Sequence, residues 1–297
     1  MFAILALLFF HVSATQSTER NCVSLEQYDS LTSPAVPTVL SFTCPDTKQH
    51  LCYIGTCHDN NPSHPQYTTL DAQWKHFLKQ THPENSVIIA EALANDDTYH
   101  YFTTRNQAIA VASDRGYAGW LAKKYGVRFV GGDLCHKAMI QQLLEEFPKE
   151  QVHYFCFAFA ADFWTRYEEK PDLPSFILER VHYWTGDASI TFDSLVKLHE
   201  QYTNRKFVRP ERQFFVRLMT LTYHTNRIGR VLTYFSVPSK VLGIIYPLLR
   251  RSHQIRDTHT FNIIKEQWQA GKNIFVVYGA LHAVALRDAL QVLTQQK

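Results

Sequence analysis

Charged residues are scarce in this chain: Asp, Glu, Lys and Arg make up 19% of its 297 residues, below the roughly one quarter that is usual for globular proteins. No dense run of Lys or Arg is present, and the net charge is only +3 with neutral histidine. The chain therefore lacks the basic patch typical of nucleic-acid-binding proteins, and we expect no nucleic-acid partner. Hydrophobic residues make up 45%, which is enough for a sizeable core.

Long hydrophobic runs are also missing. Two apolar stretches, 2–10 and 241–251, are each too short to cross a bilayer as a helix, so we expect no transmembrane helix in the mature chain. The first stretch is followed by small and polar residues, as in a secretory signal. We therefore predict a signal peptide over residues 1–14 and a secreted or periplasmic, extracytoplasmic location. A buried N-terminal strand is the alternative.

The six cysteines include no Cys-x-x-Cys pair, which argues against a zinc site built on paired thiolates. In an oxidising compartment the cysteines are candidates for disulfides instead. "TVLSF" (38–42) and "LCYIG" (51–55) bracket a turn, which predicts a hairpin. Cys44 and Cys52 flank this turn and could face each other across it, although the sequence alone does not fix the connectivity.

Near-continuous apolar runs indicate buried strands. "VIIAE" (87–91), "VRFVGG" (127–132) and "IFVVYG" (274–279) have this form. Such runs are typical of strands that are covered on both faces in a largely parallel sheet. "VHYFCFAFA" (152–160) is a further candidate strand.

Helical patterns lie between the strands. We expect helices at 69–81, 106–126 and 257–272, the second ending at Gly126 and the third at Gly271. Alternation of such helices with apolar strands predicts an α/β fold, a largely parallel mixed sheet flanked by helices.

The segment 160–255 differs from the rest of the chain, because it is rich in aromatic residues and has no clear strand. We interpret it as a helical insertion or cap, with an apolar helix at 241–251. No low-complexity linker marks a boundary, so we predict a single α/β domain over 22–297 that carries an aromatic-rich helical cap.

Titratable side chains follow four of the predicted strands. His58 comes after "LCYIG", Glu91 ends "VIIAE", Asp133 follows "VRFVGG", and His282 follows "IFVVYG". In open α/β sheets, ligands bind outside the carboxyl ends of the strands. If the sheet is parallel, the four groups share one edge of the molecule.

Two of these strand ends have the same form: "YIGTCH" and "VYGALH" both read as an apolar strand, Gly, two residues and His. Each Gly permits a tight exit from the strand and a close backbone approach. Two imidazoles with a carboxylate between them suit a divalent transition metal. We therefore predict that His58, Glu91 and His282 bind Mn, Co or Zn, which would make a nucleophile of bound water.

Further polar residues are candidates for supporting roles. Asp133 either caps a helix that starts near Leu134 or belongs to the site. Arg256 and Asp257 are expected to open the helix before the last strand, with Asp257 at its N-cap or first turn. Arg256 could clamp an anion, hold a substrate carbonyl oxygen, or pair with Glu91 or Asp133.

Cys57 adjoins His58, but a catalytic Cys–His pair meets in space and not in sequence, so we do not expect Cys57 to be a nucleophile. Among the remaining histidines, His259 lies about one helical turn from Arg256 and is the one that we expect nearest the site.

The motifs "GTCH" and "GALH", with "IIAE" between them and "RD" before the last predicted helix, resemble those of the TraB/TIKI and erythromycin-esterase-like superfamily, which also includes ChaN-like haem-binding proteins. The resemblance covers about 50–135 and 255–295. For TIKI-like members it implies a metal-dependent protease with His58, His282 and Glu91 in the site. For esterase-like members it implies water activation by His58 and Glu91 with Arg256 and Asp257 nearby.

The sequence thus leads to a secreted hydrolase as the first hypothesis, with a peptide as substrate and an ester or lactone as the second choice. If no metal binds, Glu91 is the best general-base candidate. The rival from another class is a protein that binds haem or another small ligand, which the fifteen histidines and the aromatic-rich cap would suit.

Overall fold

A computed structural model describes residues 36–94, 101–165, 167–204, 206–207 and 239–295. Its centre is a five-stranded sheet in the order β1-β2-β5-β3-β4. The strands are β1 (Thr38–Thr43), β2 (His50–Thr56), β3 (Ser86–Leu93), β4 (Arg128–Asp133) and β5 (Asn273–Gly279). β1 is antiparallel to β2, and the other pairs are parallel. The predicted α/β fold with a largely parallel mixed sheet is confirmed.

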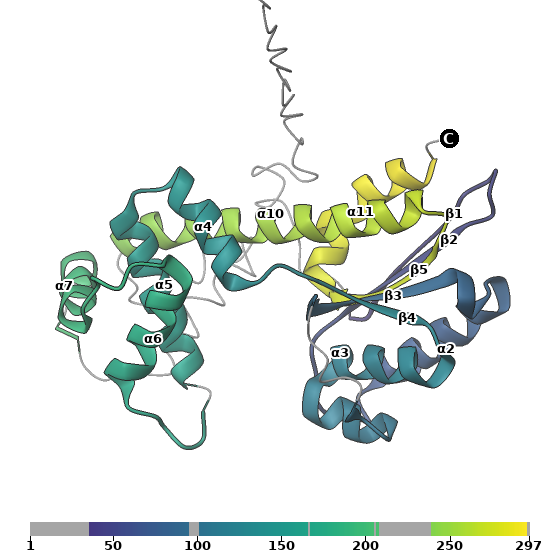
Figure 1. The fold of residues 1–297 in the computed structure, drawn as a ribbon, viewed down its shortest axis with the longest axis horizontal. Helices are drawn as coiled ribbons and strands as arrows, with labels where there is room; N and C mark the ends of the chain where they lie inside the picture. The colour runs from purple at the N-terminus through teal and green to yellow at the C-terminus, as the bar shows by residue number, and fades with distance from the viewer. Residues whose placement is uncertain (1–35, 95–100, 166, 205, 208–238, 296–297) are drawn as a thin grey trace, which may run out of the picture.

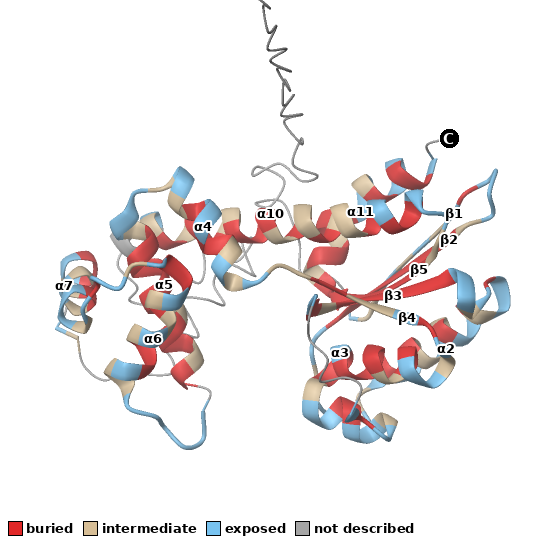
Figure 2. Cartoon of the chain, in the orientation of Figure 1, coloured by how far each residue is buried: buried red, intermediate tan, exposed pale blue. Residues whose placement is uncertain are grey.

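Alternation along the central strands sorts their side chains onto the two faces of the sheet, as a period of two requires. Ile54, Ile88 and Phe275 face α2 (Pro65–Gln80) and α3 (Arg105–Tyr125). Tyr53, Ile89 and Val276 face α10 (Ser239–Gln269) and α11 (Ala280–Gln295). Buried segments therefore run through the centre of the sheet on both faces (Figure 2). β4 differs from the prediction, because it is an edge strand and its first half is partly exposed.

A second, wholly helical lobe lies beside the sheet (Figure 1). It contains α4 (His136–Glu146), α5 (Lys149–Thr165), α6 (Leu173–Thr185), α7 (Phe192–Thr203) and the first half of α10. Its buried core is separate from those of the sheet and rich in aromatic residues, as predicted for a cap. The lobe begins near His136 and not at residue 160, and residues 208–238 of the predicted cap lie outside the described residues.

Two predictions about the elements are wrong, a strand and a break between two helices. "VHYFCFAFA" (152–160) is not a strand, because it lies in α5. That helix is buried on nearly every side, and an apolar run of this kind does not distinguish a buried helix from a buried strand. The helices expected at 241–251 and 257–272 form one helix, α10, which ends at Gln269 before Gly271 at φ +77°. No glycine or proline lies between 251 and 257 to interrupt it.

The cysteine and targeting predictions have different outcomes. Cys44 and Cys52 are free, and they do not face each other because Cys52 pairs with Ser41 while Cys44 bonds to Gln49. Cys57, Cys135 and Cys156 are also free. The predicted signal peptide over residues 1–14 lies outside the described residues. Within the described ranges, no helix has the length and hydropathy to cross a membrane.

Gly131 in β4 offers a test of how tightly the sheet edge is packed. A Cβ there would lie 2.2 Å from the backbone oxygen of Leu93, so backbone would have to shift. We expect Gly131→Ala to lower the free energy of unfolding by about 1–3 kcal/mol, measured by urea denaturation. In α10, a Cβ on Gly243 meets no described atom within 4 Å, so Gly243→Ala should be neutral or stabilising by up to about 1 kcal/mol. Equal effects of both substitutions would contradict this account.

Candidate active site

The carboxyl ends of the parallel strands lie at the sheet edge that is turned toward the helical lobe, where the chain leaves β4 and crosses to α4 (Figure 1). His58 follows β2, Glu91 lies near the end of β3, and Asp133 ends β4. His282 lies in the first turn of α11, directly after β5. The strand order places β5 between β2 and β3, so the four predicted strand-end residues meet at this edge.

The Glu91 carboxylate is at the centre of the group. Its Oε2 atom lies 3.2 Å from His58 Nε2 and accepts a hydrogen bond from the backbone N–H of Gly279 at 3.0 Å. Its Oε1 atom accepts from Arg256 Nη2 at 2.7 Å. Burial alone would raise the pKa of Glu91, but the nearby charges of His58 and Arg256 hold it well below its usual range. Glu91 is therefore an anion at neutral pH.

His58 lies between two carboxylates. Nε2 faces Glu91, while Nδ1 donates to Asp114 Oδ1 at 2.9 Å. Desolvation lowers the pKa of His58, but the charge of Glu91 and hydrogen bonds with Asp114 and Glu91 outweigh it and raise the pKa to about 11. In the metal-free protein, His58 is therefore an imidazolium, although 47% of its side chain is exposed.

Asp114 is a site residue that the sequence analysis missed. It is fully buried and also accepts hydrogen bonds from the hydroxyls of Thr56 and Ser113. The chain presents it at a break in α3, where Ala112 and Ser113 leave helical geometry and Ser113 has φ +51°. In the sequence this segment shows only a helical pattern, and no signal in it marks Asp114 as the partner of His58.

The second histidine is held in the same way. His282 Nδ1 donates to Asp257 Oδ1 at 2.5 Å, and both side chains are buried. Burial lowers the pKa of His282, but the charge and the hydrogen bond of Asp257 raise it overall. His253 packs on His282 with ring centroids 5.9 Å apart. His253, which the sequence analysis did not single out, thus lies beside the site.

Gly279 shows how closely the three predicted metal ligands approach one another. His58 Nε2, Glu91 Oε2 and His282 Cδ2 each lie 3.2 Å from the place where a Cβ on Gly279 would stand. Cδ2 is bonded to Nε2, so this edge of the His282 ring is opposite the nitrogen that faces Asp257. The named atoms of the two imidazoles are at most twice that distance apart. Two nitrogens that each bind one ion at about 2 Å are no more than about 4 Å apart, so a shared ion requires the two rings to lie closer than this upper limit.

The glycines of the two motifs have a different role from the predicted tight exit. Gly55 and Gly279 both lie within strands, and neither has a positive φ. A Cβ on Gly55 would lie 2.7 Å from Ala280 Cα, so this glycine lets α11 pack against β2. The predicted close backbone approach is confirmed, and the prediction of a special turn is wrong.

Arg256 links two of the predicted acids. Besides its bond to Glu91, it donates from Nε to Asp133 Oδ1 at 2.8 Å and from Nη2 to Asp133 Oδ2 at 2.9 Å. Asp133 also accepts from the backbone N–H of Leu134, although α4 begins only at His136. Asp257 is not an N-cap or first-turn residue, because α10 begins at Ser239 and continues through it.

Comparison with protein-family models and with curated proteins finds no match to this chain. The resemblance to the TraB/TIKI and erythromycin-esterase-like superfamily therefore rests on the short motifs alone.

The pH dependence of stability tests the His58 ion pairs. Because the folded protein binds the His58 proton more tightly than the unfolded chain, this stabilisation is complete below about pH 6.5 and is lost as the pH rises toward about 11. We expect chelator-treated protein to lose stability from pH 7 to pH 10 with a slope below about 1.4 kcal/mol per pH unit, since His58 is half exposed. His58→Gln should flatten the urea-unfolding profile over this range.

His82→Gln is the control for that measurement, because it removes an imidazole that is 84% exposed and that precedes β3, at the other end of this strand from Glu91. The same slope in His58→Gln and in the unsubstituted protein would show that the two carboxylates do not hold the His58 proton.

Proposed function

We propose that the protein is a hydrolase that acts on amide or ester bonds with a divalent metal ion at His58, Glu91 and His282. The observation that carries this proposal is the pair of imidazoles. Each is held at Nδ1 by a buried carboxylate, and the opposite edge of each ring lies beside Gly279 and the Glu91 carboxylate. A peptide is the first choice of substrate and an ester or lactone the second. We also propose that the protein is secreted, on the basis of the signal peptide predicted from the sequence.

The donor set fits a metal. Histidines that ligate a metal almost always donate their other ring N–H to a carboxylate or carbonyl, which fixes the tautomer and orients the ring. Asp114 and Asp257 supply this support for His58 and His282. Arg256 and the N–H of Gly279 orient the Glu91 carboxylate. When bound, the ion would polarise a carbonyl and lower the pKa of water.

The protonation states favour the metal over direct water activation by Glu91. An efficient general base has a pKa near the working pH. The pKa of Glu91 is held well below that range, and the pKa of His58 is raised to about 11. Glu91 is thus too weak a base and His58 is already protonated. A divalent cation that takes the place of the His58 proton would still offset the charge of the Glu91 carboxylate and would free Nε2 as a ligand.

The remaining residues have positioning roles in this proposal. The His58 side chain is the exposed member of the group, at 47%, whereas those of Glu91 and His282 are 15% and 6% exposed. Substrate would therefore reach the site from the side of His58. Arg256 donates three hydrogen bonds to Glu91 and Asp133. We therefore assign it the role of positioning these carboxylates and not that of clamping a substrate.

Elemental analysis tests the metal site. After incubation with Mn, Co or Zn and dialysis, we expect His58→Ala and His282→Ala each to retain about one ion fewer per chain than the unsubstituted protein. Hydrolysis of peptide and ester panels should fall by about 100-fold or more, because the ligands of the ion are lost. His82→Ala should change neither quantity. Equal metal content in all variants would refute the shared site, and a Soret band that survives chelation would favour the haem-binding alternative.

Asp114 gives a second test, which probes positioning. Asp114→Asn leaves a hydrogen-bonding side chain of the same size but removes the charge that holds His58, so metal affinity should fall by about 10–100-fold. Asp71→Asn is the matched control. Like Asp114, Asp71 has a cationic partner and a hydroxyl partner, here Arg105 and Tyr117, but it lies outside the site. Competition against a chelator measures both affinities. Equal losses in the two variants would remove Asp114 from the site.

A further inference from the structure

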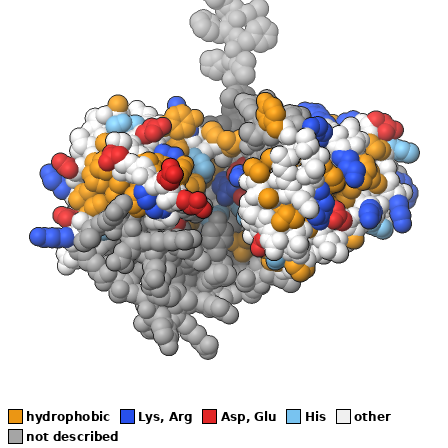
Figure 3. All heavy atoms as spheres, turned by 90° about the horizontal axis from the view of Figure 1, so that it is seen from below, with side chains coloured by type: hydrophobic (Ala, Val, Ile, Leu, Met, Phe, Trp, Pro, Cys, Tyr) orange, Lys and Arg blue, Asp and Glu red, His pale blue; other side chains and the backbone are white. Residues whose placement is uncertain are grey.

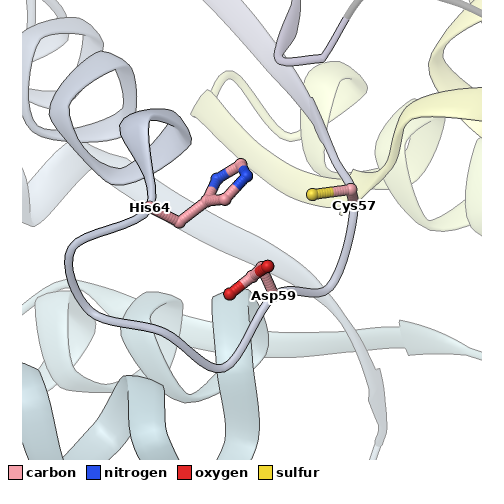
Figure 4. Close-up of side chains that lie close together, drawn as sticks. All are labelled: Cys57, Asp59 and His64. Carbon is pink, nitrogen blue, oxygen red and sulfur yellow. The ribbon is translucent and has the colours of Figure 1, made fainter.

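A second group of metal-ligand side chains lies on the loop after β2. Cys57, Asp59 and His64 each offer one ligand atom, and these atoms lie within 4.8 Å of one another. Figure 4 shows the Cys57 thiol directed toward the His64 ring, with the Asp59 carboxylate beside both. No other set of three or more ligand-type residues in the described part of the chain is this compact.

The loop backbone sets this arrangement. His58 has φ +55°, a reversal that places its neighbours Cys57 and Asp59 toward one side. Asp59 Oδ1 accepts from the backbone N–H of Asn61 at 2.7 Å, and the hydroxyl of Tyr67 donates to the carbonyl of Asp59. A carboxylate has a second oxygen, so the Asn61 bond still leaves a ligand atom on Asp59.

His64 begins helix α2 and faces the loop from the other side. Its Nδ1 accepts from the backbone N–H of Gln66 at 3.3 Å. This capping hydrogen bond is long, and Pro65 at the first helical position by itself favours the start of the helix. The ring can therefore exchange the cap for a stronger ligand bond at little cost.

Gln66 supplies an independent observation. The residue is completely buried, and its amide oxygen accepts from the backbone N–H of Cys57 at 3.0 Å and from the Cys57 thiol at 3.3 Å. Its amide nitrogen is buried and has no hydrogen-bond partner among the residues that the structure describes. A buried donor without a partner is costly. A metal ion cannot accept this hydrogen bond itself, but a water ligand of the ion can. This donor is on the Gln66 side chain, whose amide oxygen contacts the Cys57 thiol.

We propose that Cys57, Asp59 and His64 form a second site, which binds a zinc-class divalent ion. The mixed thiolate, imidazole and carboxylate set suits Zn²⁺ or Co²⁺, whereas Mg²⁺ and Ca²⁺ prefer oxygen ligands. Cys57 releases its thiol proton to solvent as the sulfur–metal bond forms. The thiolate and the Asp59 carboxylate then balance the two positive charges of the ion. Three protein ligands leave a fourth tetrahedral position for water.

This inference does not depend on the proposed hydrolase, because the two sites share no ligand. The absence of a Cys-x-x-Cys pair argues against a site with paired thiolates, but one thiolate with imidazole and carboxylate ligands is a different set. Since His58 lies between Cys57 and Asp59 in the chain, the second ion would fix the backbone from which His58 reaches Glu91.

Cobalt titration of the full chain, stripped with chelator, tests the second site. Thiolate ligation gives Co²⁺ a sulfur-to-metal charge-transfer band, which His and Glu ligands do not give. We expect this band in the unsubstituted protein, its loss in Cys57→Ser, and an affinity reduced by about tenfold or more in His64→Asn, which keeps a capping side chain. Zn²⁺ should displace Co²⁺ and abolish the band.

Two controls separate the sites. Cys135→Ser removes another exposed thiol and should keep the band, as should His282→Ala, which removes a ligand of the proposed hydrolase site only. Absence of the band in the unsubstituted protein, its persistence in Cys57→Ser, or unchanged affinity in His64→Asn would overturn the inference. Loss of the band in His282→Ala would also overturn it, because the thiol would then ligate the hydrolase ion. Unchanged cobalt content in His282→Ala with the band intact would instead refute the hydrolase site alone.

Discussion

The pairing of the largely buried Glu91 carboxylate is the interaction on which the sheet edge depends. An ionised carboxylate that loses water is costly unless charges and hydrogen bonds replace the water. Glu91 obtains them from three separate parts of the chain: His58 after β2, the N–H of Gly279 in β5, and Arg256 in α10. The parallel order of β2, β5 and β3 is what allows these parts to converge.

Both charged partners of Glu91 are themselves held by a second carboxylate. Asp114 holds His58 and Asp133 holds Arg256, while Asp257 holds the neighbouring His282. His58 and Ser113, which adjoin this network, have φ values of +55° and +51°. Such conformations cost on the order of 1–3 kcal/mol each and persist where the surroundings fix them. The strain lies on both sides of the His58–Asp114 contact, the contact that the proposed metal site requires.

The sequence predicted the fold and the grouping of His58, Glu91, Asp133 and His282 because both follow from local patterns. Buried parallel strands are continuous apolar runs, and their carboxyl ends must share an edge. It did not predict Asp114, because the helical pattern of the sequence continues through the break in α3 that presents this residue. At this break the two parts of α3 approach closely, since a Cβ on Gly116 would lie 2.2 Å from the backbone oxygen of Ala108. The buried helix α5 was mistaken for a strand because its apolar residues cover all faces, which removes the helical period.

The unbroken course of α10 explains why the helical lobe matters to the sheet edge. Its first half places Ile245, Leu248, Leu249 and Ile255 in the core of the lobe. The residues that follow directly, Arg256 and Asp257, reach Glu91 and His282 from the same turn. One turn later, Thr260 donates to the carbonyl of Gly132 in β4. Two helices, as the sequence indicated, would have let the lobe and the edge pack independently. A single helix holds Arg256 and Asp257 in place, because its first half packs in the lobe and its second half packs on the sheet. The lobe therefore helps to position the site.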